Sequence, residues 1–124
     1  MPGSLETAIG NWNIRERTKG RFESTHELVQ AYIGGNRDAA LFWLQAVEAL
    51  ACGIGSLINV LDPAAVIIGG GIARSGAALF EPLQKALDKV EWRPTGSQVK
   101  LVPAQLGEFA GAYGAAHNAM RATL

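Results

Sequence analysis

The pattern of apolar and polar residues predicts several helices, with two short strands in the second half of the chain. The longest helix is expected to start at Asn36 or Asp38, either of which can cap it, and to end at about Leu61. Its apolar residues recur at steps of three and four, as one buried face requires. This stripe consists of Leu44, Val47, Ala51, Ile54, Ile58 and Leu61. Asp62-Pro63 ends the helix, because the residue before a proline disfavours helical dihedral angles.

Four further helices are expected from the same periodicity. They cover residues 5–17, the segment from Ser24 to Gly34, residues 76–90, and a last segment from about 109 to 120. Ser24 with Glu27 three positions later is typical of a helix start. Ser75 is expected to cap the helix over 76–90, in which Pro82 either produces a kink or marks the true start.

An apolar run over residues 64–68 predicts the first strand. The run is short, rich in valine and isoleucine, and lacks alternation, so both of its faces are expected to be covered, as in a parallel sheet. Residues 98–103 predict a second strand. The order strand, helix, strand, helix implies parallel strands joined by a right-handed crossover. Because two strands make no stable sheet alone, further sequence, a partner chain or an overlooked strand must complete it.

Three glycines, Gly69, Gly70 and Gly71, follow the first strand directly. A glycine-rich turn lets a ligand approach the backbone closely, and the free N–H groups of a following helix favour phosphate. Nucleotide binding is therefore the leading hypothesis. The alternative is a tight turn from strand to helix that binds nothing.

Composition narrows the class of protein. The 124 residues suffice for one domain with a modest core, at 48% apolar and 18% charged content. Eleven basic residues balance eleven acidic ones, so no nucleic-acid partner is expected. Cys52 is the only cysteine, which excludes an intrachain disulfide. No uninterrupted apolar stretch of about 18 residues and no signal peptide are found, which favours the cytoplasm and no membrane partner.

Several segments, taken in order, resemble the carboxyl-terminal part of the ROK family of bacterial sugar kinases and related repressors. They are Gly3-Ser4-Leu5-Glu6, Leu57 to Pro63, Val66 to Gly71, and Leu106 to Ala116. The resemblance implies an α/β fold, part of a ribonuclease-H-like lobe of the actin and hexokinase type. It is helix-rich with a short parallel strand pair. Residues 1–124 would form a single partial domain of that lobe.

The same resemblance implies roles for particular residues. Gly69, Gly70 and Gly71 would lie beside the nucleotide, and Glu6 would accept hydrogen bonds from sugar hydroxyls. Without the resemblance, Glu6 is simply an acidic residue that favours the first turn of a helix. ATP with Mg is expected for the complete enzyme. No structural zinc is expected, because the position of the family's last zinc ligand holds Ser4.

The sequence does not contain the family's Asp-x-Gly-x-Thr phosphate segment or the Asn-Asp pair that supplies the catalytic base. No catalytic residue is therefore assigned. The chain is expected to be a fragment of an ATP-dependent, glucokinase-like hexose kinase, inactive alone and homo-oligomeric. The alternatives are a sugar-sensing repressor domain and a non-catalytic dimerisation scaffold.

The remaining residues with reactive side chains are given structural roles. His26 and His117 are expected at the surface or in an interface, and Cys52 is expected as a small buried apolar group. The carboxylates at helix ends or on solvated helix faces are Asp38, Glu48, Asp62, Asp88 and Glu108.

Overall fold

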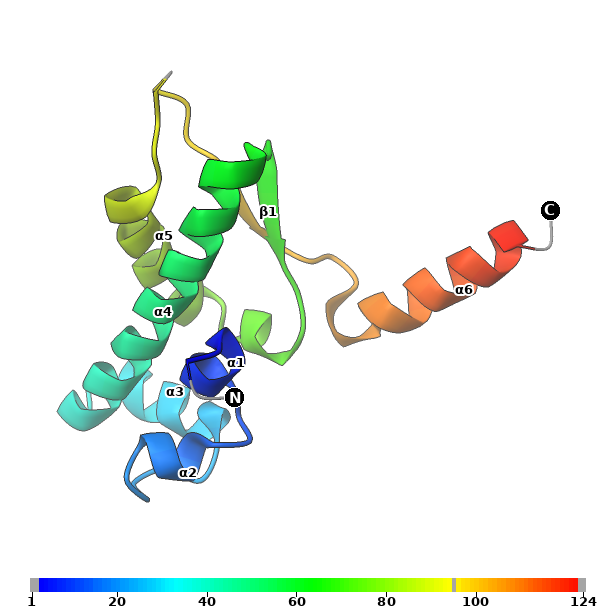
Figure 1. Cartoon of the computed structure of the whole chain (residues 1–124). Coiled ribbons are helices and arrows are strands. Elements are labelled where there is room, and N and C mark those ends of the chain that lie inside the picture. Colours follow the sequence, from blue (N-terminus) through cyan, green and yellow to red (C-terminus); the bar gives the residue numbers. More distant parts are fainter. Residues whose placement is uncertain (1–2, 95, 123–124) are drawn as a thin grey trace.

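A computed structural model describes residues 3–94 and 96–122 of the chain (Figure 1). The first half is helical: α1 (Leu5–Ile9), α2 (Ile14–Arg17), α3 (Thr25–Ile33) and α4 (Arg37–Leu61). The second half alternates strands and helices: β1 (Ala65–Ile68), the 3₁₀ helix η1 (Gly71–Ser75), α5 (Ala77–Val90), β2 (Lys100–Pro103), the 3₁₀ helix η2 (Gly107–Phe109) and α6 (Ala110–Ala122).

The helix α4 runs through the centre of the core, and α1, α3 and α5 pack around it. Trp43 of α4 and Leu79 and Leu83 of α5 are completely buried. The expected stripe is confirmed over its middle, where Val47, Ala51, Ile54 and Ile58 are buried. Its two ends are wrong, because Leu44 and Leu61 are 37% and 67% exposed. Sequence spacing gives the direction of a helix face but does not show where the neighbouring helices stop covering it.

Both ends of α4 follow the expected chemistry. Asn36, rather than Asp38, is the cap: its Oδ1 accepts a hydrogen bond from the N–H of Ala39 at 2.9 Å. Asp62 closes the helix in the left-handed conformation, with φ of 46°, and its N–H donates to the carbonyl oxygen of Ile58. The chain can then turn back through Pro63 into β1.

A hydrogen bond joins α4 to α5, and its acceptor is free because α5 contains a proline. Pro82 lies inside α5 and has no N–H, so it cannot donate to the carbonyl oxygen of Ala78. The indole Nε1–H of Trp43 donates to that oxygen instead, at 2.8 Å. Pro82 therefore neither starts nor breaks α5; it leaves an acceptor free for a side chain of α4.

The single helix expected over residues 5–17 is wrong. Gly10 ends α1 in an extended conformation, and a Cβ atom at this position would lie 2.4 Å from the carbonyl oxygen of Glu6. Asn13 lies in the following turn and donates to the carbonyl oxygen of Thr7 at 2.6 Å. Two short helices result. The next helix, α3, begins as expected, with Ser24 Oγ accepting from the N–H of Glu27.

The strands β1 and β2 pair in parallel, with Ala65 opposite Lys100 and Ile68 opposite Pro103. This confirms the parallel strand pair. Ser75 does not cap α5; it lies in η1, and Gly76, with φ of 53°, precedes the helix. The expectation fails because a 3₁₀ turn is inserted between the glycines and α5.

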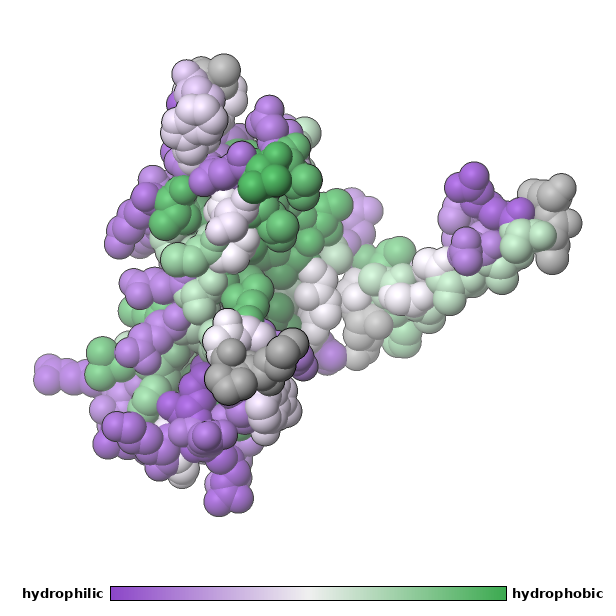
Figure 2. Space-filling view, viewed as in Figure 1, coloured by the Kyte–Doolittle hydropathy of each residue, from purple (hydrophilic) through white to green (hydrophobic). Residues whose placement is uncertain are grey.

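Two parts of the surface are unusually apolar. Figure 2 shows apolar side chains gathered over the carboxyl end of α4 and β1. There Leu57, Val60, Leu61 and Ile67 are between 59% and 80% exposed. The helix α6 points away from the body, and none of its residues is buried (Figure 1).

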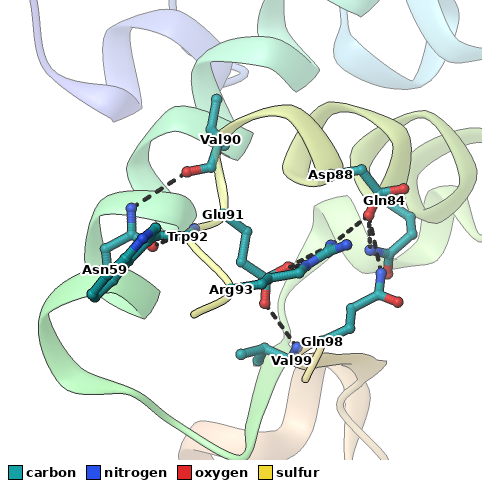
Figure 3. A network of polar contacts seen from close by, with 9 residues as sticks. All are labelled: Asn59, Gln84, Asp88, Val90, Glu91, Trp92, Arg93, Gln98 and Val99. Carbon is teal, nitrogen blue, oxygen red and sulfur yellow. Dashed lines mark hydrogen bonds and ion pairs between the residues drawn. The ribbon is translucent and has the colours of Figure 1, made fainter. Parts of the chain in front are cut away.

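A network of polar side chains fixes the loop between α5 and β2 (Figure 3). Glu91, whose side chain is 2% exposed, accepts from the N–H of Val99 at 2.8 Å and from Arg93 Nη2 at 2.6 Å. Arg93 also donates to Asp88 at 2.7 Å. On the other side of the loop, Asn59 of α4 accepts from the N–H of Trp92 at 2.9 Å. The loop is therefore tied to α4, to α5 and to the start of β2.

The helix α4 is long and apolar enough to cross a membrane by length and composition alone. Its buried stripe packs against α1, α3 and α5 within the described part of the chain, as in the core helix of a folded domain.

We expect Trp43→Phe to lower the free energy of unfolding by about 1–3 kcal/mol. The substitution removes the indole N–H that donates to the carbonyl oxygen of Ala78, and Pro82 has no N–H that could replace it. Urea unfolding followed by circular dichroism measures this change. In the Pro82→Ala background the new N–H can donate to Ala78, so the same substitution should cost about 1 kcal/mol less. Equal costs in both backgrounds would show that this hydrogen bond is not what fixes the two helices. Trp12→Phe, at a 65% exposed tryptophan, is the control.

The network around Arg93 predicts a pH dependence. Hydrogen bonds from Arg93 and then Gln84 lower the pKa of Asp88 below its ordinary value of 3.8. A carboxylate with a lowered pKa in the folded state stabilises the protein above the unfolded pKa, and this stabilisation is lost as the pH falls. The wild type should therefore unfold at a higher urea concentration than Asp88→Asn at pH 5, and this difference in the urea midpoint should disappear as the pH falls to 2. In the Arg93→Gln background, we expect that pH-dependent difference to shrink; an unchanged difference would contradict the assignment.

Candidate functional site

The three glycines after β1 have three different surroundings. A Cβ atom on Gly69 would lie 3.3 Å from the Cβ of Ala104, the residue that follows β2, so the two strand ends approach closely here. Gly70 has φ of 77°, a conformation that favours glycine. Gly71 begins η1, has open space where a Cβ would be, and lines a cavity. Of the three, Gly71 faces a space that a ligand can occupy.

This cavity has a volume of about 770 Å³, within the range of pockets that hold small molecules. Three segments form it: the end of α1 with the following turn, one face of α3 along its whole length, and η1. The lining residues are Ile9, Gly10, Asn11, Thr25, His26, Val29, Gln30, Ile33, Gly71, Ile72, Arg74 and Ser75. The cavity therefore lies beyond the carboxyl ends of the parallel strands, where α/β sheets commonly bind ligands.

The lining is largely apolar, with a few polar groups. Arg74 carries the one formal charge among the lining residues, and it is positive. Asn11 Oδ1 accepts from the N–H of Thr25 at 2.7 Å and so joins the turn after α1 to the start of α3. The Thr25 hydroxyl oxygen is buried and has no hydrogen-bond partner among the described residues. Such an arrangement suits a ligand with an apolar ring system and a negatively charged end.

Glu6 does not line the cavity, but it lies close to it. Its carbonyl oxygen accepts from the N–H of Gly10, a lining residue, at 2.7 Å, which places the two one helical turn apart. Ser4 Oγ caps the same short helix by accepting from the N–H of Thr7 at 3.1 Å. The side chain of Glu6 is exposed. The first turn of α1 therefore carries an exposed carboxylate one helical turn before a lining residue.

The other carboxylates are arranged as structural groups. Asp38 forms an ion pair with Arg21, and Asp88 is bound by Arg93. Glu48 is exposed on α4, and Asp62 ends that helix. Among the described residues, no three His, Cys, Asp or Glu side chains gather closely enough to hold a metal ion.

A second cavity, of about 460 Å³, lies at the opposite ends of the strands, beside Asp62 and Trp92. Its wall includes Glu91 and Asn59, whose polar atoms are already engaged in the loop network of Figure 3.

The expected burial of Cys52 is wrong, because Cys52 lies on the exposed face of α4.

Sequence reasoning missed three residues of the larger cavity. His26 is exposed, as expected, but it also lines the cavity together with Gln30 and Arg74. Of these three residues, Arg74 is the one that a local pattern could have identified, because it follows the third glycine by three positions. His26 and Gln30 reach the cavity only because the fold brings α3 and η1 to the same cavity, and this long-range arrangement leaves no trace in local spacing.

Comparisons with known proteins identify the family of this chain. The model of the ROK family matches residues 1–122. The chain is 40% identical over 83 residues to a glucokinase of Thermotoga maritima, a match that covers 66% of this chain and 26% of that protein. It is 34% identical over 99 residues to an N-acetyl-D-glucosamine kinase of Pasteurella multocida, with 79% of this chain and 32% of that protein covered.

A solved structure, the ROK hexokinase of Thermus thermophilus, superposes with a TM-score of 0.73 at 28% identity. That match covers 91% of this chain and 39% of the hexokinase chain. The chain thus spans between a quarter and a third of the two curated relatives it matches. The family match extends over nearly the whole sequence, and we conclude that this chain belongs to the ROK family and has part of the actin-like fold of its sugar kinases.

Proposed function

We propose that this chain is the nucleotide-binding part of the carboxyl-terminal lobe of an ATP-dependent hexose kinase. The observation that carries the proposal is the cavity of about 770 Å³ that joins Gly71 and Arg74 of η1 to α3 and the end of α1. Residues 1–124 would then form one partial domain, and the nucleotide and the sugar would bind between it and the rest of the kinase fold.

In this proposal the adenosine part of ATP occupies the apolar part of the cavity. The side chains of Ile9, Val29 and Ile72 line it and would exclude water from the base. The phosphates would extend toward the glycine turn. There the backbone of Gly69, Gly70 and Gly71 allows close approach, and the positive charge of Arg74 favours the phosphate oxygens.

Glu6 is the proposed sugar-binding residue. A carboxylate accepts hydrogen bonds from two neighbouring hydroxyls of a hexose with charge-assisted strength. Its exposed side chain on the first turn of α1 supports the proposal, because the carboxylate is accessible to the hydroxyls of a ligand.

The chain's described residues would bind and orient the substrates rather than complete the reaction. Phosphoryl transfer also requires a base that accepts the proton of the sugar hydroxyl, together with Mg²⁺ at the phosphates. The described carboxylates other than Glu6 are engaged in ion pairs, lie at a helix end or are exposed on helix faces away from the cavity lining. We therefore propose that the isolated chain binds a nucleotide without turning it over.

A kinase is favoured over a sugar-sensing repressor because the curated relatives described above are a glucokinase and an N-acetyl-D-glucosamine kinase. Both names point to a hexose or an N-acetylated hexose as substrate. Because the phosphate donor is cytoplasmic ATP, we place the protein in the cytoplasm.

The nucleotide proposal predicts that Gly71→Leu and Arg74→Gln each weaken binding of ATP or a non-hydrolysable analogue at least about tenfold. The first side chain fills the cavity, and the second removes its charge. Isothermal titration calorimetry with Mg²⁺ and the nucleotide measures the effect. Arg121→Gln on α6 removes the same charge outside the cavity lining and should leave the affinity unchanged within about twofold. Loss of binding in this control, or none in the first two variants, would refute the proposal.

The sugar proposal predicts that Glu6→Gln weakens binding of glucose or N-acetylglucosamine by about tenfold or more, because charge-assisted hydrogen bonds become neutral ones. Saturation-transfer NMR with the nucleotide present detects weak sugar binding. Glu16→Gln, an exposed acid in the first turn of α2, is the matched control. Sugar signals that survive Glu6→Gln unchanged would remove Glu6 from the site.

A further inference from the structure

The second cavity, at the ends of the strands away from the glycine turn, has an exposed tryptophan on its wall. Its volume of about 460 Å³ is enough for a small molecule or a long side chain. The wall is formed by the end of α4 with the turn after it, and by the loop between α5 and β2. Trp92 of that loop is 70% exposed, although tryptophan has one of the largest apolar side chains. The cavity therefore offers an aromatic surface to a ligand.

The backbone of Trp92 is held in place even though its side chain is exposed. Its N–H donates to Asn59 Oδ1 at 2.9 Å, and Asn59 Nδ2 donates to the carbonyl oxygen of Val90 at 3.3 Å (Figure 3). On the other side of the loop, the carboxylate of Glu91 accepts from the N–H of Val99 at 2.8 Å. A ligand that packs on the indole therefore does not have to order the loop first, which lowers the entropic cost of binding.

The wall of this cavity has one uncompensated charge, and it is negative. The formally charged lining residues are Asp62 and Glu91, and Glu91 is paired with Arg93. Asp62 is exposed and forms no ion pair within the described part of the chain. Its left-handed conformation, with φ of 46°, turns the chain from α4 back toward β1 and places it on the same wall as Trp92. A positively charged ligand is therefore favoured.

The other polar groups of the wall are largely engaged, which narrows the class of ligand further. Both polar atoms of the Asn59 side chain form hydrogen bonds to the loop. Both carboxylate oxygens of Glu91 accept hydrogen bonds, and Gln98 Nε2 donates to Asp88 at 3.0 Å. A sugar would need several free partners for its hydroxyls. An organic cation needs only a carboxylate and an aromatic face.

We infer that the cavity between Trp92 and Asp62 binds an organic cation, either a quaternary ammonium compound or the guanidinium group of an arginine side chain. The face of the indole attracts the cation, and the carboxylate of Asp62 balances its charge. Pro63 and Pro94, which also line the cavity, provide apolar surface for the carbon atoms of the ligand. The inference does not depend on the proposed nucleotide or sugar residues.

The test is a titration of the ¹⁵N-labelled chain with tetramethylammonium chloride, followed by NMR of the indole N–H signals. Sodium chloride at equal ionic strength is the reference. The chain has three tryptophans, and Trp92→Phe identifies the signal of Trp92 by its loss. That signal should shift saturably, with a dissociation constant on the order of 10 mM, because one aromatic face and one carboxylate hold the cation. The signal of Trp12, which is 65% exposed, should follow the reference.

Asp62→Asn should weaken the binding at least about fivefold, because it removes the charge but keeps a residue type that adopts the left-handed conformation. Glu48→Gln removes an exposed carboxylate of α4 outside the cavity lining, and it should change the affinity less than about twofold. A parallel titration with N-acetyl-L-arginine amide distinguishes the two sources of the cation. Tighter binding than tetramethylammonium assigns the cavity to an arginine side chain, and weaker binding assigns it to a free ammonium compound.

Three outcomes would overturn the inference. The first is a Trp92 signal that moves no more than that of Trp12. The second is binding that Asp62→Asn leaves unchanged. The third is a saturable shift of the Trp92 signal with glucose but not with either cation, since a sugar would then be the ligand.

Discussion

The hydrogen bond from the indole of Trp43 to the carbonyl oxygen of Ala78 holds α5 against α4, and the position of the candidate site depends on this contact. Pro82 makes the acceptor available by lacking an N–H. Because η1 immediately precedes α5, fixing α5 also fixes η1 relative to α3, which packs on the same α4. The shape of the cavity between α3 and η1 therefore depends on a core contact at the first turns of α5. A substitution in that contact would change the position of η1 relative to α3.

Much of the fold could be predicted from local patterns. The apolar run before the glycines gave β1 within one residue, and the three- and four-residue spacing gave the direction of the α4 stripe. The failures have a common cause. Gly10 ends α1 because of a close approach to Glu6, and Ser75 loses its expected role because η1 intervenes. In both cases, the deciding factor is backbone geometry that composition and periodicity do not contain.

The candidate site was predictable only in part, because its wall comes from three separate segments. The glycine turn is a local signal: it follows β1 directly, and Gly71 lies on the wall of the cavity. It did not distinguish the glycines: Gly69 approaches Ala104 closely, Gly70 has a positive φ, and Gly71 alone of the three lines the cavity. His26 and Gln30 could not be found from sequence because their place follows from the packing of α3.

The described part of the chain divides into a stable body and parts that depend on something outside it. The body is the cluster around α4, in which residues from α3, α4 and α5 are completely buried. The outer face of the sheet, where Ile67 is 68% exposed, and α6, none of whose residues is buried, lie outside this cluster, whereas Ile68 of β1 belongs to it. Parts with few buried contacts open most readily, and η1 has no buried residue whereas α3 buries Leu28 and Val29, so we expect the η1 side of the cavity to open more readily than the α3 side. A partner that packed on the sheet and on α6 would therefore also stiffen η1, and under the proposed function it would raise nucleotide affinity without touching the nucleotide.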